Sequence, residues 1–180
     1  MLVARERRKK NVSEYVLYMW QVEDTLRALN FNMDLVEEKI IAQFKQKGSK
    51  NEEIRDWYAN LILSMHEEGI KTKGHLKIVT AVIDELYELH KRLIFELKDP
   101  VYFSLYEAAR ESIIHFKQKL QKPDANEVEV CFYGLYGLLL LRLKNKEIGK
   151  QTKDAMQTFS AMLSGLTKHF HMIEQGKAEF

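Results

Sequence analysis

The residues best suited to binding a metal ion lie in the segment 107–115. Glu107, Glu111 and His115 are spaced four residues apart and would follow one face of a helix. Carboxylates and an imidazole on one face can ligate a metal ion. A di-iron helical bundle, however, needs Glu-x-x-His pairs, and the chain contains none. Arg110 beside these residues favours ion pairs on a solvated face, so we predict no metal ion and no other cofactor.

A second group of polar residues lies near the start of the chain. Gln21, Glu23 and Asp24 fall in or beside the apolar face of the first amphipathic segment. Arg142 is the only charge in the apolar run 130–143, VCFYGLYGLLLLRL. A buried charge needs a partner, so one hypothesis pairs Arg142 with Glu23 or Asp24. The alternative is that Arg142 extends along its aliphatic stem to solvent.

Other motifs for catalysis are absent. No serine, cysteine or lysine stands in a motif typical of a positioned nucleophile, so we predict no catalytic residue. His90 lies on the apolar face of a helical segment, which favours a hydrogen-bonded core or rim residue over a base. The single cysteine, Cys131, lies in the most apolar segment and is interpreted as an inert small hydrophobe. The segment 69–76 resembles a phosphate-binding loop but lacks its lysine and hydroxyl, which favours a turn.

The basic run Arg5–Lys10 concentrates positive charge near the N-terminus. Such runs can bind phosphate backbones. They also occur as solvated first turns of helices, and no recognition module accompanies this one. Nucleic-acid binding is therefore the third of three functional hypotheses.

Composition and periodicity predict an all-α protein. Of the 180 residues, 46% are hydrophobic and 30% are charged, which excludes a disordered chain. Only two prolines and eight glycines interrupt the helical patterns, and no strand-like alternation occurs. A formal net charge of +2 gives no global attraction to nucleic acid or to anionic membranes. The first residues are charged and lack the apolar core of a signal peptide, which predicts a cytoplasmic protein.

The helical segments predict one domain over residues 1–180, built from six to seven mostly antiparallel helices. A short second helix stops at Gly48, a fourth runs over about 74–97, and a fifth begins at Asp99-Pro100. The helix near 127–144 is apolar on every face, which requires a surrounding of protein or lipid. It is shorter than the ~20 apolar residues that span a bilayer. We therefore place it at the centre of the bundle and predict no membrane insertion.

Small residues predict where two helices approach closely. One side of the fifth helix carries Ser104, Ala108, Ala109 and Ser112, and the sixth helix carries Gly134 and Gly137. We expect these two surfaces to face each other. On this basis a bulky residue in place of Gly137 would cost roughly 1–3 kcal/mol by overpacking.

The segment ARERRKKNVSEYVLYMWQVED, residues 4–24, resembles the start of an uncharacterised family of Bacteroidota, catalogued as a domain of unknown function. The resemblance extends over the whole chain and includes the helix with Trp57-Tyr58. It implies a cytoplasmic bacterial protein. It implies no activity, cofactor or catalytic residue.

The leading functional hypothesis is a non-enzymatic protein-interaction module, as a homodimer or with another protein. Aromatic residues make up 11% of the chain, and there are seven methionines, residue types suited to interfaces. Tyr18, Trp20, Phe95 and Phe103 lie outside the inward-facing positions. The alternative is a small-molecule or metal-dependent enzyme with an inter-helix pocket formed by one of the polar groups above.

Overall fold

The computed structural model describes residues 2–44 and 48–177, and these contain α-helices and no strand. The predicted all-α class is confirmed. The described residues form eight α-helices: α1 (Leu2–Lys10), α2 (Val12–Ala28), α3 (Met33–Lys39), α4 (Ser49–Glu67), α5 (Lys77–Lys91), α6 (Pro100–Leu120), α7 (Glu127–Leu143) and α8 (Lys150–Glu174). The additional helix is α1, because the charged N-terminal run is itself helical.

Two short segments depart from α-helical geometry. The predicted second helix breaks into α3 and the 3₁₀ segment η1 (Ile41–Phe44), and its predicted end falls partly on residues outside the described ranges. After α5 the chain widens into the π-helical segment η2 (Arg92–Glu96), where the backbone N–H of Leu97 donates to the carbonyl of Arg92 at 2.9 Å. Single π turns of this kind are rare within helices.

Local capping explains several helix boundaries. Asp99 caps α6 by accepting a hydrogen bond from the backbone N–H of Tyr102 at 2.7 Å, and Pro100 occupies the first helical turn. Asn126 caps α7 through the backbone N–H of Glu129 at 2.9 Å. Both helices therefore begin where the sequence predicts.

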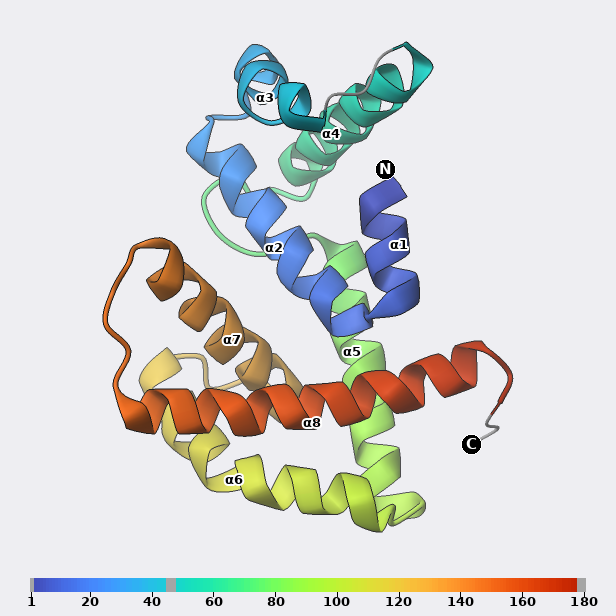
Figure 1. The fold of residues 1–180 in the computed structure, drawn as a ribbon, viewed down its shortest axis with the longest axis vertical. Coiled ribbons are helices and arrows are strands. Elements are labelled where there is room, and N and C mark those ends of the chain that lie inside the picture. The colour runs from blue at the N-terminus through green and yellow to red at the C-terminus, as the bar shows by residue number, and fades with distance from the viewer. Residues whose placement is uncertain (1, 45–47, 178–180) are drawn as a thin grey trace. The chain divides into compact units, whose positions relative to one another are not determined.

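The described chain divides into two compact units. The N-terminal unit contains the described residues of 2–10 and 14–81, and the C-terminal unit contains 11–13 and those from 82 onward. The prediction of a single domain over 1–180 stays a prediction. Within the N-terminal unit, α3 contacts both η1 and α4. Within the C-terminal unit, α6 and α8 lie side by side in opposite directions, and α7 contacts both (Figure 1).

The predicted contact between the small residues of α6 and α7 is wrong. Ser104 and Ala108 are exposed, and a Cβ placed on Gly137 would meet no atom within 4 Å. Gly134 instead faces α8, where a Cβ would lie 2.7 Å from two ring atoms of Phe159. Close approach in this unit is therefore between α7 and α8 at Gly134, and between α6 and α8 at Gly165, where a Cβ would lie 2.7 Å from Leu105 Cδ1.

This geometry predicts opposite effects for two glycines on one helix. Gly134→Ala should lower the free energy of unfolding by about 1–3 kcal/mol, because the fully buried Phe159 ring must shift. Measured on the monomeric chain, Gly137→Ala should raise it by up to about 1 kcal/mol, because alanine favours the helix and the space is open within one chain. Urea denaturation followed by circular dichroism compares the two variants, and an equal loss in both would contradict the packing.

Candidate functional site

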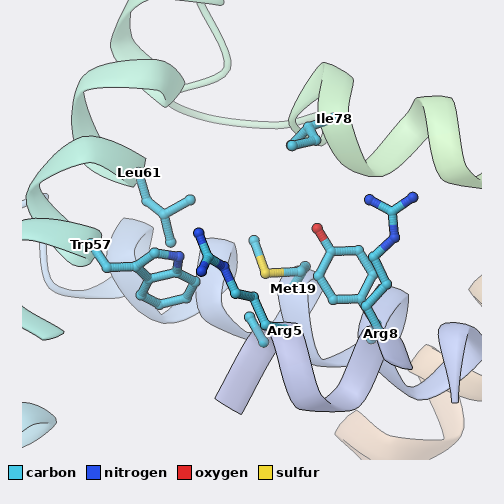
Figure 2. A pocket seen from close by; sticks show the side chains of 8 residues that line it. Arg5, Arg8, Met19, Trp57, Leu61 and Ile78 are labelled. Carbon is cyan, nitrogen blue, oxygen red and sulfur yellow. The ribbon is translucent and has the colours of Figure 1, made fainter. Parts of the chain in front are cut away.

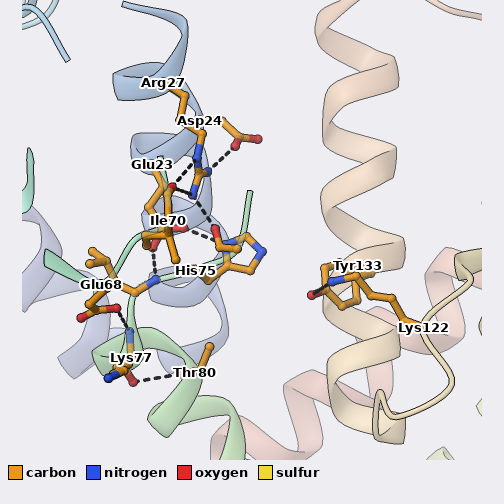
Figure 3. Close-up of polar contacts among 12 residues, drawn as sticks. Glu23, Asp24, Arg27, Glu68, Ile70, His75, Lys77, Thr80, Lys122 and Tyr133 are labelled. Carbon is orange, nitrogen blue, oxygen red and sulfur yellow. Dashed lines mark hydrogen bonds and ion pairs between the residues drawn. The ribbon is translucent and has the colours of Figure 1, made fainter. Parts of the chain in front are cut away.

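Glu23 in α2 is a charged side chain with no exposed surface. Its Oε2 lies 2.7 Å from Nδ1 of His75, and its Oε1 accepts a hydrogen bond from the backbone N–H of Leu76 at 3.1 Å (Figure 3). The His75 ring stacks on Trp20 with a centroid separation of 4.1 Å and an interplanar angle of 12°. Glu23 thereby fastens the start of α5 to α2.

Arg27, one turn further along α2, holds the same loop by its backbone. Its guanidinium donates hydrogen bonds to the carbonyl of Ile70 at 3.1 and 3.2 Å and also to the carbonyl of Gly74. Its Nη1 pairs with Asp24 at 2.8 Å (Figure 3). The loop 69–76 is therefore a fixed connection that positions α5, which agrees with the prediction of a turn.

The structure separates the first-helix candidates from one another. Glu23 and Asp24 have different partners within their own unit, and Gln21 is exposed beside a different hollow lined also by Tyr18. Arg142 is exposed near the end of α7, so the premise of a buried arginine is wrong and the alternative, that it reaches solvent, holds.

Sequence reasoning missed His75 as the partner of Glu23. The sequence predicts an exposed histidine near a helix end, whereas its side chain is only 14% exposed. Fifty-two positions separate the two residues, and no local pattern connects them. The one available signal was an acidic residue within an apolar helical face.

Glu107, Glu111 and His115 are all exposed on α6. Glu107 pairs with Arg110 at 3.6 Å, the ion pair that the sequence favours. No group of three or more histidine, cysteine, aspartate or glutamate residues in the described ranges could hold a metal ion. The three side chains therefore lie on the exposed part of α6, and His115 also lines a surface hollow between α6 and α8.

His90 lies in the core of the C-terminal unit, as predicted for an inward-facing histidine. It is 3% exposed, and its Nδ1 lies 2.7 Å from the hydroxyl of Tyr102. The ring of Tyr106 meets it edge-on at 5.0 Å, and that of Tyr87 stacks at 5.9 Å. Burial lowers the pKa of His90 to about 4, although the charge of Glu127 opposes this. The imidazole is therefore neutral at physiological pH and packs as part of an aromatic cluster.

Helix α7 is covered unevenly. Its first part is buried through Val128, Phe132 and Tyr136, whereas Leu141 and Leu143 are 39% and 60% exposed. A surface groove of about 330 Å³ runs along the second part; its lining residues are Phe116, Gly134, Gly137, Leu138, Leu140, Leu141, Lys144, Thr152 and Met156. The expectation that this helix is surrounded on every face is therefore met only over its first half.

The aromatic residues singled out in the sequence divide into two groups. Phe95 and Phe103 are 70% and 44% exposed on either side of the turn between η2 and α6. Trp20 is buried against His75, and Tyr18 is half-buried. Only the first pair remains available for an interface.

Comparison with known proteins identifies a family but no activity. Residues 1–177 match the family model described as "Domain of unknown function (DUF4924)". Neither the curated proteins nor the solved structures contain a significant match. In the described ranges, no helix is both long enough and apolar enough to cross a membrane.

Proposed function

Since the chain belongs to the DUF4924 family, whose description assigns no activity, we propose a function from its own surface. The protein is a protein-interaction module that forms a homodimer through the second half of α7. The uneven covering of α7 carries this proposal.

The apolar side chains in the second half of α7 would be stabilised by a partner that buries them. The run Leu138–Leu141 holds four consecutive leucines, and the next charge is Arg142. A helix that is apolar on every face is stabilised only where apolar groups cover it. In this chain α6 and α8 leave Leu141 and Leu143 in water. Burial of one leucine side chain contributes about 1.5–3 kcal/mol, so covering this surface would supply a substantial part of a binding energy.

A second copy of the chain fits this surface. Apolar, charge-poor patches are typical of homodimer interfaces, and twofold symmetry pairs such a patch with itself. Gly137 has open space above it, so a second helix can approach the backbone closely there. In an antiparallel crossing centred near Gly137, Arg142 and Lys144 of each copy would lie at the rim, where their charges remain solvated.

Native mass spectrometry of the untagged chain tests the proposal. We expect a dimer at micromolar concentration, and a monomer for the double variant Leu141→Gln/Leu143→Gln, which removes the exposed leucines. Leu63→Gln is the matched control, because Leu63 is 55% exposed on α4 in the other unit. This control should remain dimeric.

Two results would contradict the assignment. A wild-type chain that is monomeric throughout the micromolar range excludes the homodimer. A dimer that survives the α7 variant but is lost in Phe95→Gln/Phe103→Gln assigns the interface to the turn between η2 and α6 instead. Thermal melting of each variant verifies that the fold is retained.

The proposal includes a cytoplasmic bacterial setting, which the sequence resemblance supports. In a reducing compartment Cys131 needs no disulfide partner. Burial raises the pKa of its thiol well above the usual value, so it contributes packing and not reactivity.

A further inference from the structure

A groove of about 300 Å³ lies on the N-terminal unit, between helices that are distant in sequence. Helices α1, α2, α4 and α5 all contribute to it; its lining residues are Ala4, Arg5, Arg8, Tyr15, Met19, Trp57, Leu61 and Ile78. Figure 2 shows the Arg5 guanidinium beside Trp57 and Leu61, whereas the Arg8 guanidinium lies on the other side of Met19 in this view. The volume is at the lower end of the ~300–1,000 Å³ that is usual for small-molecule sites.

The lining carries positive charge that no acidic group of the groove balances. Arg5 and Arg8 lie on the same side of α1, and no carboxylate is among the lining residues. Neither arginine has an ion-pair partner within 4 Å among the described residues. Arg7, by contrast, pairs with Glu14 at 3.5 Å and lies over the ring of Tyr18. The helix thus divides the basic run, and it turns two arginines into the groove.

The remaining lining is mainly apolar and aromatic. Met19 forms a buried wall, and the indole of Trp57 is half-buried. Ile78 is 59% exposed at the opposite side, so an apolar surface is left in water within reach of the arginines. Guanidinium groups bind carboxylates and phosphates by paired hydrogen bonds. Apolar walls bind the hydrocarbon part of a ligand.

We propose that this groove binds a small organic anion with an aromatic or acyl body. The carboxylate or phosphate head pairs with Arg5, Arg8 adds positive charge on the other side of Met19, and the body lies against Met19, Trp57 and Ile78. This site is on the N-terminal unit and uses no residue of the α7 surface. The test of this site is therefore independent of the test of the homodimer.

Calorimetric titration of the full chain with 4-phenylbutyrate tests the proposal. The matched probe is 4-phenylbutyramide, which keeps the body and removes the charge. We expect the carboxylate to bind at least about tenfold more tightly than the amide, since charge-assisted hydrogen bonds are strong. The double variant Arg5→Gln/Arg8→Gln should weaken 4-phenylbutyrate at least about tenfold. Leu61→Gln should weaken it independently by acting on the apolar wall.

A matched control separates the groove from the charge of α1 as a whole. Lys9→Gln/Lys10→Gln removes the same charge from the same helix, but neither lysine lines the groove. Its affinity for 4-phenylbutyrate should stay within about twofold of wild type. Equal losses in the lysine and arginine variants would overturn the proposal, because they would indicate general electrostatic attraction.

Three further outcomes also overturn the proposal. One is the absence of measurable binding of 4-phenylbutyrate. Another is binding of inorganic phosphate alone as tightly as 4-phenylbutyrate, which would remove the apolar body from recognition. The third is tight, salt-sensitive binding of a single-stranded thymidine oligonucleotide without binding of 4-phenylbutyrate, which would assign the arginines to nucleic acid.

Discussion

Replacing Glu23 by alanine is expected to lower the free energy of unfolding by about 3 kcal/mol, a large fraction of the stability of a domain of this size. The substitution removes a carboxylate that has no exposed surface. It leaves the backbone N–H of Leu76 and the imidazole of His75 without the acceptor that they share. The loss of a shared buried partner costs more than the loss of one hydrogen bond, because both remaining groups stay desolvated.

Asp24→Ala is the matched control for Glu23→Ala. Asp24 is the next residue of α2 and is also ion-paired, at 2.8 Å to Arg27, but its side chain is 46% exposed. The Arg27 side chain is only 13% exposed, but it keeps its hydrogen bonds to the carbonyls of Ile70 and Gly74 when Asp24 is removed. We therefore expect a loss of about 1 kcal/mol, smaller than that for Glu23→Ala. Urea denaturation with an unchanged slope measures both variants. Equal small losses would show that the Glu23 pair does not fasten the loop, and so would unchanged hydrogen exchange at the Leu76 amide.

Features encoded by neighbouring residues could be predicted from the sequence. Asp99-Pro100 marks the start of α6 because a capping side chain acts within three residues of itself. Gly69 follows α4 with a φ of +71°, as expected for a glycine after a helix end. The inward position of His90 follows from helical periodicity alone.

Features that depend on which helices meet could not be predicted. The sequence shows Gly134 and Gly137 as equivalent small residues, yet one faces Phe159 and the other faces open space. Three residues of a helix correspond to about 300° of rotation, and only the position of α8 decides which glycine is covered. The same holds for the leucines of α7. Their hydrophobicity predicts that they are buried, but it does not show which of them other helices of the chain contact.

The polar candidates also separate into features that neighbouring residues determine and features that depend on which helices meet. Glu23 was recognisable as an acidic residue beside an apolar helical face, but its partner His75 belongs to a different helix start. The apolar run around Arg142 favours a buried arginine, although the position of Arg142 near the end of that run lets it reach solvent. The basic run Arg5–Lys10 is one patch in the sequence, whereas the helix distributes its side chains over several faces.

Lowering the pH from 7 to 5 is expected to remove about 2 kcal/mol of stability through His90 alone. The pKa of this histidine is about 4 in the folded chain, against 6.5 for an unperturbed histidine, because burial disfavours the imidazolium ion. Tyr87, Tyr102 and Tyr106 surround the ring with neutral groups, and the charge of Glu127 only partly offsets the desolvation. No group facing His90 therefore compensates fully for the cost of burying the imidazolium ion.

The direction of the effect follows from proton binding. Between pH 6.5 and pH 4 the unfolded chain takes up a proton at His90 that the folded chain does not, so stability rises with pH across this window. The contribution is complete above about pH 6.5 and is lost as the pH falls toward 4, reaching roughly 3 kcal/mol there. Carboxylates also titrate in the lower part of this range and change the stability of every variant. The contribution of His90 is therefore obtained by comparing the pH dependence of unfolding in wild type with that in a variant that lacks His90.

His90→Asn isolates that contribution, because an amide retains a hydrogen-bonding group near Tyr102 and does not titrate. Its stability at pH 7 should be lower than that of wild type, but it should fall less between pH 7 and pH 5, by about 2 kcal/mol. His66→Asn makes the same substitution at an exposed histidine of α4 and serves as the control for the replacement itself. Urea denaturation at a series of pH values measures all three chains. Parallel slopes for wild type and His90→Asn would mean that His90 accepts a proton in the folded state, which would require the aromatic cluster to open.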